Sequence, residues 1–96
     1  MPYIVRQKRN AFIDITTKLI EELKKDPDNV HGNLNYCFSS IINGILGSKY
    51  NYKSAQDMIG MLECCKLELY REQIAPYEDL KKKDNGEVYT KHESLS

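Results

Sequence analysis

Several side chains in the second half of the chain have the types and spacing needed to hold a small anion. Lys66, Tyr70 and Arg71 fall within one run, and Tyr77 follows a proline. An arginine guanidinium can donate two parallel hydrogen bonds to a phosphate, and a tyrosine ring offers a flat surface on which a base can stack. These four residues therefore predict one side of a binding site for a nucleotide-like ligand.

A second set of polar residues lies earlier in the chain. Asn35, Ser39 and Asn43 recur every four residues, with Tyr36 beside them, so that on a helix they share one face and supply neutral donors and acceptors. We expect both sets to line one pocket with apolar walls. The predicted ligand-binding residues are Asn35, Tyr36, Ser39, Asn43, Lys66, Tyr70, Arg71 and Tyr77. The same tyrosines would also suit packing at a protein interface.

An enzyme would need a nucleophile with a base, a pair of carboxylates or a metal, and none can be assembled from this sequence. His31 lies in a polar stretch that predicts a loop, with no Ser, Cys or Asp at catalytic spacing. Glu63 lies in an apolar sector and could act as an acid or base, but an ion pair with Lys66 is the simpler interpretation. We predict no catalytic residue and no cofactor.

The three cysteines, Cys37, Cys64 and Cys65, do not form a metal-binding pattern. Adjacent cysteines bridge only with strain, and a zinc site needs a fourth ligand and C-x-x-C spacing. We expect reduced, buried thiols and no metal.

The composition predicts one domain over residues 1–96, in the cytoplasm of its cell. Fourteen basic residues balance 14 acidic ones, whereas DNA or RNA binding needs an excess of positive charge. No signal peptide is visible, and no run of about 18 apolar residues predicts a membrane span.

Apolar periodicity predicts an all-α, three-helix domain. The first helix covers residues 10–25, after an arm at 1–9, and the second covers 33–46, where Gly47 caps it. The third begins with Ser54 and Asp57 as a capping box and ends at Ala75, because Pro76 disfavours helical geometry there. A short helical turn, a turn at 84–86 and a frayed tail at 90–96 follow.

These helices carry more apolar and neutral surface than 96 residues can cover. The predicted core stripes are Phe12, Ile15, Thr16, Leu19, Ile20 and Leu23; Leu34, Phe38, Ile41, Ile42 and Ile45; and Ala55, Met58, Leu62, Cys65 and Leu69. The third helix has a second apolar sector, and the second helix has no charged residue from 33 to 46. Since both extra faces need covering, we predict a homo-oligomer.

Four segments together resemble a family of small, largely uncharacterised helical proteins of bacteria and phages. They are MPYI at 1–4, GNLNY at 32–36, IGMLECCKLELYR at 59–71 and PYEDLKKKDNGEVY at 76–89. The resemblance covers most of the chain and implies a helical fold and a phage or bacterial setting, with no established activity to transfer.

A compact phage protein without catalytic residues is similar in type to the oligomeric sponges with which phages sequester nucleotide second messengers of bacterial immunity. By that analogy we expect a non-enzymatic anti-defence protein in the bacterial host cell, with itself and a small anionic nucleotide as partners. The alternative is a protein-protein interaction module that inhibits or adapts a bacterial host protein. A nucleotide should raise the melting temperature only in the first case.

Overall fold

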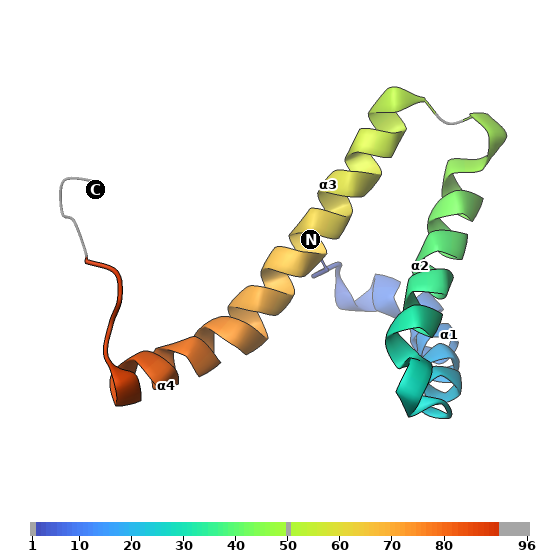
Figure 1. Ribbon diagram of the computed structural model, residues 1–96. Helices are drawn as coiled ribbons and strands as arrows, with labels where there is room; N and C mark the ends of the chain where they lie inside the picture. Colours follow the sequence, from blue (N-terminus) through green and yellow to red (C-terminus); the bar gives the residue numbers. More distant parts are fainter. Residues whose placement is uncertain (1, 50, 91–96) are drawn as a thin grey trace. The chain divides into compact units, whose positions relative to one another are not determined.

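The structure, a computed structural model, describes residues 2–49 and 51–90, and every regular element within these ranges is helical (Figure 1). The main helices are α1 (Arg6–Lys24), α2 (Val30–Leu46), α3 (Tyr52–Leu69) and α4 (Ala75–Asn85). Two 3₁₀ turns, Pro27–Asn29 and Gly47–Lys49, precede and follow α2, and a π-turn, Tyr70–Ile74, joins α3 to α4. The predicted all-α class is confirmed, and the three predicted main helices correspond to α1, α2 and α3.

Contacts between residues divide the chain into two compact units. The first unit spans Met1–Met61 and the second spans Leu62–Ser96, so that the boundary falls within α3. The first unit contains α1 and α2, which contact each other. The second unit contains the π-turn and α4, which also contact each other. The prediction of a single domain over residues 1–96 stays a prediction.

Helix α1 is longer at its start than the sequence pattern predicts. It begins at Arg6, where the Lys8 backbone N–H donates to the Val5 carbonyl at 3.0 Å, so the predicted arm at 1–9 is confined, in the described residues, to 2–5. The Arg9 side chain donates from Nε to the Ile4 carbonyl at 2.8 Å and holds this short segment against the first turn.

Helix α2 also begins earlier than predicted, at Val30 in place of Asn33. Pro27 occupies the start of a 3₁₀ turn, where its missing N–H is harmless, and Asn29 donates from its side chain to both Asp26 carboxylate oxygens at 3.1 and 3.2 Å. This local network carries the chain directly into α2. The prediction that His31 lies in a loop is therefore wrong, because His31 is in the first turn of the helix.

The capping box of α3 is displaced by three residues from its predicted place. The Ser54 N–H donates to the Asn51 side-chain oxygen at 2.9 Å, and the Asn51 N–H donates back to the Ser54 hydroxyl at 3.0 Å. Asn51 is thus the cap and Ser54 its partner three residues on. Asp57 instead accepts from Lys53 Nζ at 2.9 Å, and this hydrogen bond raises the pKa of Lys53.

Replacing Asn51 with alanine is expected to lower the free energy of unfolding by about 1 kcal/mol, because the Ser54 N–H loses its acceptor. The measurement is urea denaturation followed by circular dichroism. Asn51→Asp is the matched control, since a carboxylate oxygen keeps the acceptor, and it should stay close to the wild type. Equal losses in the two variants would contradict this assignment of the cap.

Pro76 does not end the third helical segment, contrary to prediction. Ala75 keeps α-helical angles (φ −59°, ψ −44°), and its N–H donates to the Tyr70 carbonyl five residues back. A proline in a regular α-helix would lose its hydrogen bond and press on the carbonyl four residues before it, and the wider π-turn avoids that clash. The predicted turn of helix is consequently α4, an 11-residue helix.

Helix α4 includes Asp84 and Asn85, which were predicted to be part of a turn at 84–86. Gly86 follows the helix with φ +93°, and its N–H donates to the Lys82 carbonyl at 2.8 Å. Of the predicted frayed tail at 90–96, residues 91–96 lie outside the described residues.

The predicted core stripes do not form a core within the described chain. No residue described there is buried, and in the first unit the half-buried apolar side chains of α1 are Leu19 and Leu23, both in its second half. The remaining stripe members of α1, such as Phe12 and Ile15, are exposed. Cys64 and Cys65 are exposed as well, and Cys37 is half-buried, so the prediction of buried thiols is wrong. The helices have the predicted apolar faces, but each unit has too few helices to bury those faces.

Candidate functional site

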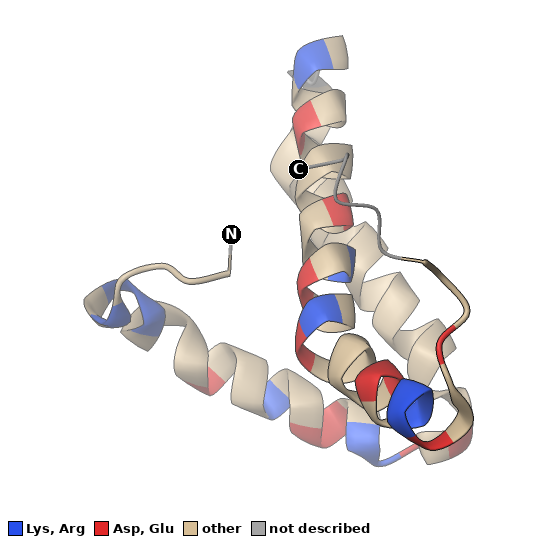
Figure 2. Ribbon diagram, turned by 90° about the vertical axis from the view of Figure 1, so that its left-hand side faces the viewer, with Lys and Arg blue, Asp and Glu red and all other residues tan. Residues whose placement is uncertain are grey.

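Four of the eight predicted ligand-binding residues lie together on α2 in the first unit. Asn35, Ser39 and Asn43 are spaced by four along the helix and are exposed, and the Ser39 hydroxyl lies 3.5 Å from the Asn35 side-chain oxygen. Tyr36 is exposed beside them. Helix α2 carries no Lys, Arg, Asp or Glu, whereas α1 and α4 carry both signs (Figure 2). This face offers neutral hydrogen-bonding groups and no charge.

The other four predicted residues, Lys66, Tyr70, Arg71 and Tyr77, lie in the second unit. Lys66 Nζ is 3.0 Å from a Glu63 carboxylate oxygen, so the predicted i,i+3 ion pair is confirmed. Both side chains are more than half exposed, which limits the contribution of this pair to stability. The ammonium group is therefore accessible to a competing anion.

Of the two predicted cationic residues, Arg71 makes more hydrogen bonds and ion pairs than Lys66. Its Nη2 donates to the two Glu68 carboxylate oxygens at 2.9 and 2.7 Å, which confirms the second predicted ion pair, and its Nε lies 3.8 Å from Glu72. The Glu68 side chain is only 16% exposed, whereas that of Arg71 is 68% exposed. A phosphate that approached the guanidinium from solvent would therefore compete with a largely covered carboxylate.

The π-turn places Tyr70 beside Glu78, which is not among the eight predicted ligand-binding residues. The Tyr70 hydroxyl donates to a Glu78 carboxylate oxygen. In a regular α-helix residues eight apart lie about 80° apart around the axis, but one extra residue in a π-turn makes them equivalent to residues seven apart, about 20° apart. The proline that needs the π-turn is thus the signal that could have predicted this contact.

Tyr77, just beyond Pro76, has a cation above its ring. Lys81 Nζ is 5.6 Å from the ring centroid, one helical turn further along α4. An ammonium at this distance is attracted to the negative face of the ring. A stacking base would therefore have the opposite face of the ring to bind.

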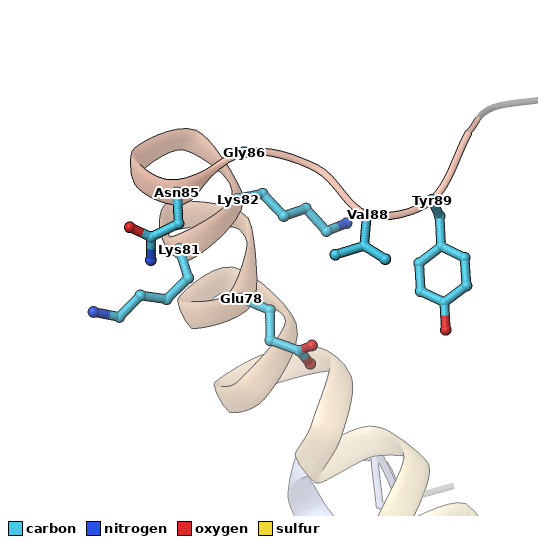
Figure 3. Close-up of a pocket in the computed structure, with 7 residues that line it drawn as sticks. All are labelled: Glu78, Lys81, Lys82, Asn85, Gly86, Val88 and Tyr89. Carbon is cyan, nitrogen blue, oxygen red and sulfur yellow. The ribbon is translucent and has the colours of Figure 1, made fainter.

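A shallow hollow lies at the end of α4, and none of the eight predicted residues lines it. Its volume is about 270 Å³, below the usual range for small-molecule sites. Its polar groups do not converge, because Lys81 and Asn85 extend to one side of α4 while Lys82 points toward Val88 (Figure 3). The lining residues are Glu78, Lys81, Lys82, Asn85, Gly86, Val88 and Tyr89.

The predicted residues are thus grouped by unit: four uncharged ones on α2, and four cationic or aromatic ones around the π-turn. That all eight line one pocket stays a prediction.

The model of one protein family, described as a domain of unknown function (DUF6899), matches residues 1–88. The chain is a DUF6899 protein. All eight predicted residues and the π-turn lie within the matched part of this DUF6899 chain. No curated protein and no solved structure matches it.

Two further observations concern the described part of this DUF6899 protein. Across residues 2–49 and 51–90, no helix combines the length and the apolar character needed to cross a bilayer. In the same ranges, no three His, Cys, Asp or Glu side chains gather as they would around a metal ion.

Proposed function

We propose that this protein is a non-enzymatic, self-associating binding protein that sequesters a small anionic, nucleotide-like ligand. The observation that carries the proposal is the group of side chains around the π-turn. There an exposed guanidinium, an exposed ammonium and two tyrosine rings come from one stretch, residues 66–77. In the bacterial host cytoplasm such a protein would act as a phage anti-defence sponge for a nucleotide second messenger.

The binding step is an exchange of anions on Arg71. A phosphate oxygen takes the place of the Glu68 carboxylate on Nη2, and a planar guanidinium holds a phosphate through two parallel hydrogen bonds. Lys66, five residues before Arg71, adds a second positive charge to the same stretch, and its ammonium group pairs with Glu63 when no ligand is bound. The exposed ring of Tyr77 supplies a stacking surface for a base.

Self-association is supported by the lack of covered apolar surface. No residue within the described ranges is buried, and in the first unit alone Phe12, Ile15, Phe38, Ile41 and Ile45 are exposed. Monomeric proteins rarely leave large contiguous apolar patches in water. A second protein surface would cover these side chains and supply the core that each unit lacks.

The same exposed side chains favour a second candidate, a protein-protein interaction module that inhibits or adapts a bacterial host protein. Aromatic residues are enriched in such interfaces, and Tyr36 and Tyr52 are among the most exposed in the first unit. This candidate needs no nucleotide. It predicts co-purification with a host partner and no response to nucleotides.

A thermal-shift panel of cyclic and ADP-ribose-type nucleotides tests the proposal. A ligand at about 100 times its Kd should add about 2.7 kcal/mol to the free energy of unfolding, which raises Tm by several degrees or more. Inorganic phosphate and an uncharged nucleoside are the controls. Recovery of the nucleotide unchanged after release would support sequestration, and its hydrolysis would contradict it. A silent panel would favour the interaction module.

A further inference from the structure

One apolar stripe on α2 is exposed over the second half of the helix, although Ile42 and Leu46, which lie beside it, are half-buried. Leu34, Phe38, Ile41 and Ile45 are spaced by four, three and four residues, which is the spacing of a coiled-coil seam. Leu34 is half-buried, but Phe38, Ile41 and Ile45 are 50%, 49% and 69% exposed. The seam is therefore uncovered, within its own unit, over the second half of the helix.

Helix α1 covers only the beginning of this seam. The half-buried residues of α1 are Leu19 and Leu23, close to the turn that leads into α2, while Phe12 and Ile15 near its start are exposed. The contact between α1 and α2 thus lies near their connection. Phe38, Ile41 and Ile45 are left for a surface outside this helix pair.

The absence of charged residues on α2 indicates what that surface is. Helix α2 has no Lys, Arg, Asp or Glu, so its seam has no charged flank (Figure 2). In paired helices, charged residues beside the apolar seam select the partner. If a partner helix with such charges packed on α2, the charged side chains would lose hydrating water and would meet no opposite charge. A second copy of α2 is equally uncharged and has the same seam spacing, so it pairs without that loss.

We infer that the α2 seam packs against the α2 seam of a second copy of this chain. The contact is isologous, with each copy presenting the same residues about a two-fold axis. This inference rests on the self-association in the proposed function and assigns it to one face of one helix. It also leaves Asn35, Ser39 and Asn43 outside the seam, where they remain accessible.

Two lysine substitutions on α2 test the assignment, Ile45→Lys on the seam and Ser40→Lys as the control. Both residues are exposed in the chain, and the substitutions add the same charge to the same helix. Positions five apart lie about 140° apart around a helix, so Ser40 is off the seam. Mass by light scattering is measured over a concentration series, with circular dichroism as the check on folding.

We expect the wild type and Ser40→Lys to have the same oligomeric mass and Ile45→Lys to have a lower one. Ile45→Ala, which adds no charge, should raise the dissociation constant about 10-fold or more, because each copy loses apolar contact at the seam. If Ile45→Lys does not fold, the dissociation constant of Ile45→Ala tests the seam in its place.

Three outcomes would overturn the inference: a monomeric wild type, an Ile45→Lys variant that folds and keeps the wild-type mass, or dissociation caused by Ser40→Lys alone. The nucleotide panel is read separately on the wild type. If no nucleotide raises Tm but Ile45→Lys dissociates the oligomer, the proposed ligand is contradicted and the α2 seam is still supported.

Discussion

Replacing Gly47 with alanine is expected to lower the free energy of unfolding by about 1–3 kcal/mol. Gly47 follows α2 with φ +62° and ψ −163°, a conformation that is essentially restricted to glycine. Its N–H also donates to the Asn43 carbonyl and closes the last turn of α2. A methyl group there meets no described atom within 4 Å apart from those of Gly47 and its two chain neighbours, so the loss comes from the backbone conformation.

Gly44→Ala is the matched control, three residues earlier in the same helix. A methyl group at this position also meets no described atom within 4 Å outside the neighbouring backbone of its own helix, and the φ of Gly44 is not positive. Because alanine is favoured over glycine in a helix interior, this variant should gain about 0.5–1 kcal/mol. Urea denaturation at a single protein concentration compares the two. If Gly47→Ala were as stable as Gly44→Ala, residue 47 would not have this glycine-restricted backbone conformation in solution.

Removing the Arg71 guanidinium is expected to weaken binding of a nucleotide from the thermal-shift panel about 10- to 100-fold. Hydrogen bonds to a charged group contribute about 1.5–3 kcal/mol, and about 1.4 kcal/mol corresponds to a factor of ten. Arg71→Ala is compared with Arg71→Lys, which keeps the charge but loses the planar pair of donors and should fall between alanine and wild type. Isothermal titration calorimetry gives the dissociation constants.

Glu68→Gln should change affinity in the opposite direction. Its carboxylate accepts from Arg71 Nη2 at 2.7 Å, and a phosphate must displace it. The amide keeps the shape of the side chain while removing the competing negative charge, so the nucleotide should bind several-fold more tightly. Loss of affinity in this variant would mean that Glu68 orients Arg71 for the ligand. If neither Arg71→Ala nor Glu68→Gln changes the dissociation constant of the nucleotide, the anion does not bind at Arg71.

Features that depend on neighbouring residues were predictable from the sequence. The three main helices follow from apolar spacing, the Glu63–Lys66 and Glu68–Arg71 pairs follow from the i,i+3 geometry of a helix, and the end of α2 follows from Gly47. Each involves atoms within about one turn of helix. Their energies are therefore set before any distant part of the chain is placed.

The helix starts were less predictable, because several nearby residues compete to cap. Ser54 has the right chemistry for a cap, but Asn51 takes that position and Ser54 becomes its partner. Both arrangements satisfy the same backbone N–H groups in principle. The choice depends on where the preceding turn leaves the chain, which local patterns do not specify.

The contact between Tyr70 and Glu78 could not be predicted from helical spacing. Eight residues of regular α-helix would separate the two side chains by about 80° around the axis, and the helix was predicted to end before Pro76. The π-turn changes the phase of α4 relative to α3 by one residue. One extra residue thus decides which side chains share a face near Arg71.

By itself, the sequence determined the helical class of this chain, the phase of its apolar stripes and its local ion pairs, because these follow from interactions over a few residues. The tertiary structure alone decided which stripes are covered: α1 covers part of α2, and Phe38, Ile41 and Ile45 remain exposed. Coverage depends on where whole helices meet. Periodicity shows that a face is apolar but not what lies against it.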